Sequence, residues 1–335
     1  MKKSLIALAV AGVVSAPAFA ATSNVDIYGK LHGSMSYFND GLGKDTQFSS
    51  NASRIGFKGS EDLGGGLKAI WQLESGVNID EGDGSWVSRN SFVGLAGDWG
   101  TALLGRHDTP LKLVGRAVDL FGDTMADSRN VMGGGSDTRA DNVLAYISPS
   151  FSGFGVAIAY TNDLAGTGNG GDKIDQSAWN ANVTYSNGPL YLGLGYGDGD
   201  AHDSAGLGAQ WRVAGGYTFG NFKIVGQYDS LEGDGVVGDD YDAWMVGGAY
   251  TMGNVVLKAN YMAGEIDGCT IGACDPEQWT IGADYNLSKR TSVYALYADG
   301  QDVVMGGGAG SSDQIGAAPG DSDVSTISVG VTHSF

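Results

Sequence analysis

The feature that most constrains this fold is a two-residue alternation of apolar and polar side chains in segments of about ten residues. In 210–219 the odd positions carry Trp, Val, Gly, Tyr and Phe, and the even positions carry Gln, Arg, Ala, Gly and Thr. The same pattern recurs in 154–160, 179–185, 242–252 and 278–287, with aromatic residues near the segment ends. Successive side chains of a strand point to opposite faces, so each segment has one apolar and one polar face.

Alternating strands of this kind occur in soluble sandwiches and in membrane barrels. A soluble sandwich has more Lys and Glu on its polar face and fewer aromatic residues at the ends of its apolar face. Segments of this length with aromatic ends are typical of lipid-facing strands. In a bilayer, only a closed barrel lets strands satisfy all their backbone hydrogen bonds. The pattern therefore predicts an all-β transmembrane barrel.

The first residues predict export from the cytoplasm. Lys2 and Lys3 precede an apolar run over 5–14, and Ala18 and Ala20 are the small residues expected before a cleavage site. We expect residues 1–20 to be a signal peptide and 21–335 to be the mature barrel. A buried N-terminal helix is the less favoured alternative. After residue 20 no apolar run reaches the 18 residues of a membrane helix.

The charge balance restricts the partners. Two of the 19 Lys and Arg residues lie in the expected signal peptide, which leaves 17 basic against 38 acidic residues, a net charge of −21. This argues against nucleic acid or an anionic membrane surface as the main partner. The 57 glycines and only 6 prolines exclude collagen-like and Pro-rich disordered chains and suit many tight turns.

A weak internal repeat indicates the number of strands. Tyr185, Tyr217, Tyr250 and Tyr285 are spaced by 32, 33 and 35 residues, and each is followed by a short turn. The repeating unit is a hairpin, and eight such units predict a single-domain, 16-stranded antiparallel transmembrane β-barrel. A barrel of that size is too wide for its side chains to fill, so an aqueous channel should remain. We expect strands near 24–38, 52–60, 67–78, 88–97, 100–106, 141–148, 153–163, 177–187, 190–198, 209–219, 221–231, 241–252, 254–264, 277–287, 291–300 and 324–335.

The long loop, residues 107–141, interrupts this regular array. It shows no two-residue alternation, has only a weak helical patch, and contains the glycine triplet 133–135. Such a long insertion between strands is usually functional. We interpret it as a loop that folds into the barrel and narrows the bore.

The two cysteines, Cys269 and Cys274, are five residues apart in an expected outward loop. In an oxidising compartment this spacing favours a small-loop disulfide. Two free thiols are the alternative. Neither the spacing nor the neighbouring residues indicate a metal site.

Several stretches resemble the general diffusion porins of Gram-negative outer membranes, a trimeric 16-stranded family. They are SRIGFKGSEDLGGGLKAIWQLE (53–74), SFVGLAGDWGTALLGR (91–106), the long loop that follows, and the terminal ISVGVTHSF (327–335). The resemblance covers essentially all of 21–335. It implies outer-membrane localisation, a homotrimer and a third loop folded into the bore. Phe335 resembles the C-terminal signal that the barrel-assembly machinery recognises.

Strand parity predicts which basic residues line the bore. Val25, Ile27, Leu31 and Met35 share the outer face of the first strand, which places Lys30 inward; likewise Ile55 and Phe57 place Arg54 and Lys58 inward. By the resemblance Phe92 points outward, which places Arg89 inward, and Arg106 ends the fifth strand beside the long loop. The expected basic wall is Lys30, Arg54, Lys58, Arg89 and Arg106.

The expected acidic side is Asp119, Asp123 and Asp127, spaced by four residues in the long loop. Asp119 and Asp123 fall where the family carries the acids of its constriction. The alternative is a solvated face of a short helical turn. Lys112, Arg116, Arg129 and Arg139 in the same loop could neutralise these acids locally. The family often has a further arginine at the start of the sixth strand, whereas 142–148 has none.

Catalytic and cofactor functions find little support. Of the four histidines only His107, beside Asp108, suggests catalysis, and it lacks a nucleophile in register. We expect no enzyme activity, no cofactor and no metal site, since phosphate-loop and Cys/His spacings are absent. The acidic outer loops, including Asp234, Asp239 and Asp240, match no calcium-loop spacing. We expect them to contact lipopolysaccharide through divalent cations.

The expected function is passive diffusion of small hydrophilic solutes and ions, with selectivity from bore width and from the field between the acidic loop and the basic wall. The acidic outer loops favour a mild cation preference. Two alternatives stay open. One is a substrate-selective channel for phosphate or short acids, and the other is a structural or adhesive barrel that acts through its outer loops.

Overall fold

A computed structural model of the chain describes residues 24–41, 43–133, 137–162, 177–199, 208–233, 240–269, 274–306, 315–316 and 323–335. The expected signal peptide, 1–20, and most of the acidic outer loops, including Asp234 and Asp239, lie outside these residues. Within the described ranges, no helix is both long enough and apolar enough to cross a membrane.

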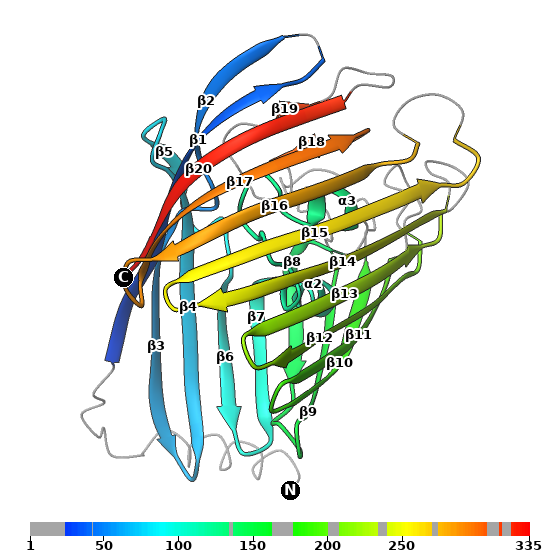
Figure 1. The fold of residues 1–335 in the computed structure, drawn as a ribbon. Helices are drawn as coiled ribbons and strands as arrows, with labels where there is room; N and C mark the ends of the chain where they lie inside the picture. Colours follow the sequence, from blue (N-terminus) through cyan, green and yellow to red (C-terminus); the bar gives the residue numbers. More distant parts are fainter. Residues whose placement is uncertain are drawn as a thin grey trace, which may run out of the picture.

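A closed antiparallel barrel of 16 strands forms the molecule (Figure 1). The described part of its sheet contains 18 strand segments, because β2 (Lys44–Ser50) and β5 (Asp83–Ser85) extend two wall strands. The wall strands are β1 (Asn24–Asn39), β3 (Arg54–Gly64), β4 (Leu67–Asn78), β6 (Ser91–Gly97), β7 (Gly100–Asp108), β8 (Arg139–Ile147), β9 (Phe154–Thr161), β10 (Ala178–Asn187), β11 (Leu190–Gly199), β12 (Gln210–Phe219), β13 (Phe222–Leu231), β14 (Tyr241–Met252), β15 (Val255–Ile266), β16 (Glu277–Asn286), β17 (Thr291–Gln301) and β20 (Asp323–Ser334).

The sheet closes between its first and last strands. β1 pairs with β20 from Lys30↔Ser334 to Asn39↔Ser325, and on its other side with β3 and β2. Each other wall strand pairs with its neighbours in sequence, as the hairpin repeat predicts. Closure leaves no strand edge unpaired around the ring, which is the condition for crossing a bilayer with strands.

The two faces of the wall separate as the alternation predicts. On β12, Trp211 is 46% exposed on the outer face, whereas its neighbour Arg212 is 0% exposed on the inner face. The outer aromatic and aliphatic side chains of β9, β10, β14 and β16 are likewise exposed. This exposed apolar surface surrounds the barrel, and the bore-facing side chains are mostly polar or small.

All sixteen expected wall strands are present, with boundaries shifted by a few residues. Two segments that lie between expected strands, 39–47 and 80–85, contain paired residues, since β2 and β5 continue the ladder there. Backbone hydrogen bonds between strands do not require an apolar face. The ladder therefore continues past the segments in which apolar and polar residues alternate. The remaining elements are α2 (Pro110–Arg116), α3 (Arg129–Met132) and the short pair β18 (Val304–Met305) and β19 (Ile315–Gly316).

Candidate functional site

The long loop begins with a well-defined helix. The side chain of Thr109 caps α2 by accepting a hydrogen bond from the backbone N–H of Lys112, and Pro110 occupies the first turn, where no N–H is needed. α2 contacts β10, β11 and β12, and α3 contacts β14 and β15 (Figure 1). These contacts are with the face of the strands opposite to the exposed apolar surface.

One side of the long loop is apolar and fully buried. Val114, Val118, Phe121 and Met125 are at most 1% exposed. They belong to a hydrophobic cluster with inward-facing side chains of β12 to β15, β17 and β20, among them Ala214, Met245, Met262, Leu296 and Val324. The long loop and these inner faces thus share one packed apolar core.

The other side of the long loop is charged and centred on Arg116. Its guanidinium lies 2.8 Å from a carboxylate oxygen of Asp123, 3.0 Å from Asp127 and 3.9 Å from Asp119. Asp123 also reaches the wall, at 2.9 Å from Lys30 Nζ and 3.6 Å from Arg54 Nη1. Asp123 is thus the point where the charged side of the loop meets the wall.

The environment of Asp123 favours its ionised form. Burial opposes the charge, but Lys30, Arg116 and Arg54 outweigh burial and lower the pKa of this carboxyl. A group held ionised in this way keeps a fixed negative charge at the contact between loop and wall over the physiological pH range.

Asp119 lies elsewhere than expected. Its carboxylate accepts hydrogen bonds from the backbone N–H groups of Phe121, at 2.8 Å, and Ser128, at 3.3 Å. Burial and the nearby Asp127 raise its pKa to about 6, in spite of Arg116. The expectation that Asp119 faces the wall bases is wrong, because its contacts are within the loop. The alternative of a solvated acidic face is wrong as well, since the side chains of Asp119, Asp123 and Asp127 are 1%, 8% and 0% exposed.

The five expected wall bases do not converge on the loop acids. Lys30 and Arg54 meet Asp123, whereas Arg89 pairs with Glu74 of β4 at 2.7 Å and Arg106 pairs with Asp141 of β8. Lys58 lies 5.3 Å from the ring centroid of Tyr28 and has no ion pair among the described residues.

Two details of the sequence-based placement are corrected. Phe92 faces inward, because β6 exposes Val93 and Leu95 on the outer face. Arg89 nevertheless reaches the inward-facing Glu74, since the chain over 86–90 leaves the strand and Val87 has a φ of 57°. The sixth wall strand does begin with an arginine: β8 starts at Arg139, which contacts Asn90 and Asp108.

Comparison with known proteins identifies the family. Residues 7–303 match the family model described as Gram-negative porin. The chain belongs to the Gram-negative porin family. This porin is 30% identical to outer membrane porin protein 32 of Delftia acidovorans over 360 residues, which covers the whole of both chains. It is 36% identical to major outer membrane protein P.IB of Neisseria gonorrhoeae over 171 residues, 48% of each chain.

Solved structures give the same result. The anion-selective porin from Comamonas acidovorans superposes with a TM-score of 0.77 at 27% identity, over 93% of this porin and all of that chain. OmpF of Salmonella typhi shares the fold, with a TM-score of 0.71 at 17% identity over 93% of this porin and 98% of that chain. The chain is therefore an outer-membrane porin, a water-filled barrel for the passive diffusion of small hydrophilic solutes and ions.

In the ion pairs that Arg54, Arg89 and Arg116 form, the base is more exposed than the acid. In the pair of Arg139 with Asp108 the two side chains are equally exposed, and in the pair of Lys258 with Asp284 the acid is the more exposed. The exposed fractions of the side chains are 25% for Arg54 against 8% for Asp123, and 19% for Arg89 against 10% for Glu74. Arg116 is 30% exposed, and its partner Asp127 is 0% exposed. In these three arginine pairs the carboxylate lies behind the guanidinium group, and the guanidinium group is the part of the pair exposed to solvent.

The structure also contains an arginine to which the sequence analysis gave no role. Arg212 of β12 is fully buried and contacts both the long loop and β13. The sequence signal was a single charge on the otherwise uncharged inner face of its strand. Among the described residues, no cluster of three or more His, Cys, Asp or Glu is placed to hold a metal ion.

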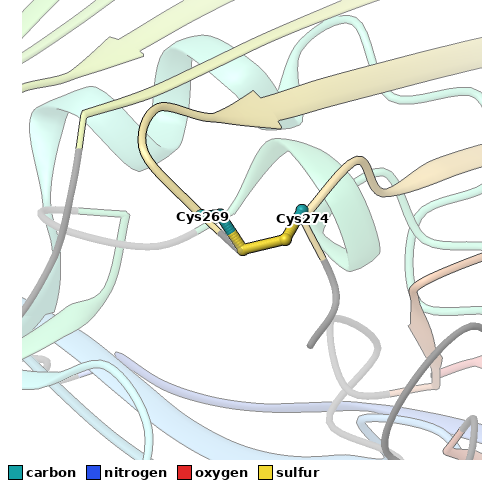
Figure 2. The surroundings of a disulfide bond; sticks show 2 residues. All are labelled: Cys269 and Cys274. Atoms are coloured by element: carbon teal, nitrogen blue, oxygen red, sulfur yellow. A yellow bond between two sulfur atoms is a disulfide. The ribbon is translucent and has the colours of Figure 1, made fainter. Parts of the chain in front are cut away.

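The remaining predicted sites lie away from the bore. Cys269 and Cys274 form a disulfide in the turn between β15 and β16, which confirms the predicted bond (Figure 2). The backbone of Phe335 exchanges two hydrogen bonds with Gly29 of β1, at 3.0 and 3.1 Å. A Cβ on Gly29 would lie 2.3 Å from the Phe335 ring, so the ring lies directly over this glycine.

Proposed function

We propose that the narrowest section of this porin lies between the long loop and the wall formed by β1, β3 and β4, and that this section favours small anions. The observation that carries the proposal is the exposure of the ion pairs there. Arg54, Arg89 and Arg116 present their cationic groups to water in front of buried carboxylates. An anion that passes meets the cations at closer range than the acids behind them.

Distance and screening determine which charges dominate. Two unit charges 4 Å apart interact with an energy of about 1 kcal/mol in water and about 4 kcal/mol near a protein surface. We expect the acidic outer loops to be fully solvated, and salt then screens their field within about 8 Å. Charges at the narrow section should therefore outweigh the net charge of −21. The proposal reverses the mild cation preference that the outer loops alone suggest.

Similarity to a characterised channel adds support. The solved porin from Comamonas acidovorans is described as anion-selective. It shares 27% of its residues with this chain over most of the barrel. The preference of that protein is a precedent, and the ion pairs of this chain are the independent argument.

The test is the reversal potential of single channels in a KCl gradient. We expect the natural protein to prefer chloride, Arg54→Gln with Arg116→Gln to shift the reversal potential towards potassium, and Asp123→Asn to shift it further towards chloride. Lys44→Gln, on the exposed extension β2, is the matched control and should change nothing. A cation preference that the bore variants leave unaltered would show that these residues do not set selectivity. Saturable current would indicate a substrate-selective channel, and absence of current a structural barrel.

We also propose that this porin forms a homotrimer, and that Phe335 is the C-terminal signal by which the barrel-assembly machinery recognises the chain. An outer membrane protein of similar fold, OmpT of Vibrio cholerae, has been solved in a trimer form. Phe335 is suited to an assembly signal because its backbone pairs with β1 at the closure of the sheet. Deleting Phe335 should reduce the heat-modifiable trimer band on gels without altering single-channel conductance; an undiminished band would reject the signal.

The acidic outer loops are proposed to contact lipopolysaccharide through divalent cations. Their net negative charge and the phosphates of that lipid need a bridging cation to adhere. Chelation with EDTA should release lipopolysaccharide from purified trimers, and retention of the lipid after chelation would count against the bridge.

A further inference from the structure

We propose that Arg212, buried in the wall opposite the charged section, is a positioning residue that sets the width of the bore by holding both ends of the long loop. This inference rests on the proposed role of the loop as the constriction. Arg212 lies on β12, on the side of the apolar cluster, and is 0% exposed. It acts on the bore only through the loop.

One guanidinium contacts the two ends of the loop at once. Arg212 Nη1 donates to the carbonyl oxygen of Leu111 in α2, at 3.3 Å, and Nη2 donates to that of Met132 at the end of α3, at 2.7 Å. Nη1 also pairs with Asp137, beyond α3. The planar fork of arginine can serve such separated acceptors together, whereas the single ammonium of lysine cannot.

The wall fixes the guanidinium itself. Arg212 Nε donates to a carboxylate oxygen of Asp229 on β13 at 2.7 Å, and Nη2 contacts its second oxygen. This pairing holds the plane of the guanidinium in one orientation. A buried charge is tolerated when it is paired and fully hydrogen-bonded, and Asp229 together with Asp137 provides that compensation.

The backbone of the loop fits closely over the guanidinium. Gly115 lies in α2, and a Cβ there would be 2.7 Å from Arg212 Nη1. Two asparagines of β10 hold the same turn: Asn180 Oδ1 accepts from Leu111 N at 2.7 Å, and Asn182 Nδ2 donates to Pro110 O at 2.7 Å. Other wall side chains also hold the two ends: Tyr191 donates to Val114 O at 3.4 Å near the start, and Tyr241 donates to Val131 O at 2.6 Å near the end. Arg212 contacts both ends with one side chain.

The held ends determine where the middle of the loop lies. Asp123, which meets Lys30 and Arg54, is between the two attachment points, Leu111 and Met132. Releasing Arg212 should let the charged side of the loop shift from the wall while every charge that lines the bore stays the same. A positioning role therefore predicts a wider bore with little change in ion preference.

The experiment compares Arg212→Met combined with Asp229→Asn, the milder Arg212→Lys, and Gly115→Ala. The paired substitution keeps side-chain length and removes the charge of Asp229, whereas Asp137, the second acid paired with Arg212, keeps its charge. Gly115→Ala adds only a methyl group against the guanidinium, and Gly43→Ala, where nothing lies within 4 Å, is its matched control. Heat-modifiable gel mobility reports whether each barrel has folded.

We expect single-channel conductance to rise roughly 1.5- to 2-fold in the paired variant, because conductance follows the open cross-section. Arg212→Lys and Gly115→Ala should show smaller rises in the same direction. Liposome swelling should show faster entry of larger neutral sugars, with the reversal potential nearly unchanged. Gly43→Ala should match the natural protein.

Two results separate this inference from the proposed function. Folded Arg212 and Gly115 variants with natural conductance and sugar entry would overturn the positioning role, even if Asp123→Asn still shifts the reversal potential. If Asp123→Asn also changes nothing, the constriction itself is misplaced. If the paired variant does not fold, Gly115→Ala and Arg212→Lys decide the question.

Discussion

The two halves of the barrel interior are built on different physical principles, although a single loop forms part of both. Against β12 to β15, β17 and β20 the long loop buries Val114, Val118, Phe121 and Met125 in an apolar cluster. Against β1 and β3 it presents Arg116 and Asp123 to Lys30 and Arg54. Apolar burial is non-directional, whereas the charged contacts act on passing ions and are screened by salt. The apolar half holds the loop in place. Charged residues in the other half can therefore be substituted while the loop stays docked.

The largest expected effect comes from removing the centre of the apolar half. Phe121 is 1% exposed, and its ring also lies 4.7 Å from Lys258 Nζ. Phe121→Ala should weaken loop docking by about 3–5 kcal/mol, as for other large-to-small core substitutions. Planar-bilayer recordings should then show higher and noisier conductance. Phe48→Ala, at an exposed site on β2, is the control. Quiet channels of natural conductance would mean that the charged half alone can hold the loop.

A smaller effect should come from the protonation of Asp119 in the charged half. Because the pKa of Asp119 is raised to about 6, this carboxyl is ionised above pH 6 and neutral below it. As pH falls from 7.5 to 5, the loop loses one negative charge beside Arg116, so the reversal potential should move towards anions. Asp119→Asn should show the low-pH value throughout this range. A pH response of the same size in that variant would assign the titration to another group.

The smallest effect is expected from the disulfide, which lies at the rim of the apolar half. Cys269 and Cys274 close a loop with a sequence separation of five, for which chain entropy gives about 2 kcal/mol of stabilisation. The double substitution Cys269→Ser, Cys274→Ser should leave conductance and selectivity unchanged and lower thermal stability slightly. Mass spectrometry should find neither thiol alkylated before reduction, and alkylation without reductant would contradict the bond.

The strands of the wall could be predicted from local sequence patterns. The contacts of the site residues could be predicted only in part, because they depend on residues far away in the sequence. The alternation around Trp211 and Trp279 fixes strand and face together, because a one-residue slip would bury every aromatic residue on the wrong side. The acids Asp119, Asp123 and Asp127 share one spacing, yet only Asp123 reaches the wall. Asp119 turns to backbone N–H groups of its own loop, and this difference depends on how 119–128 folds. Arg212 could be assigned to the inner face, but its partners are 75 to 101 residues away in the loop.

The pairing of β1 with β20 also determines the order in which the protein can be completed. Ser36 and Ser328 share a hydrogen bond across this seam, although 292 residues separate them. Every other pair of wall strands can form as soon as its own hairpin has been made, whereas β1 must wait for the last strand. Contacts between such distant residues are slow to form, and an unpaired strand edge invites pairing with other chains. During biogenesis the open edge of β1 is therefore the most vulnerable part of the chain, and any event that delays β20 prolongs that exposure.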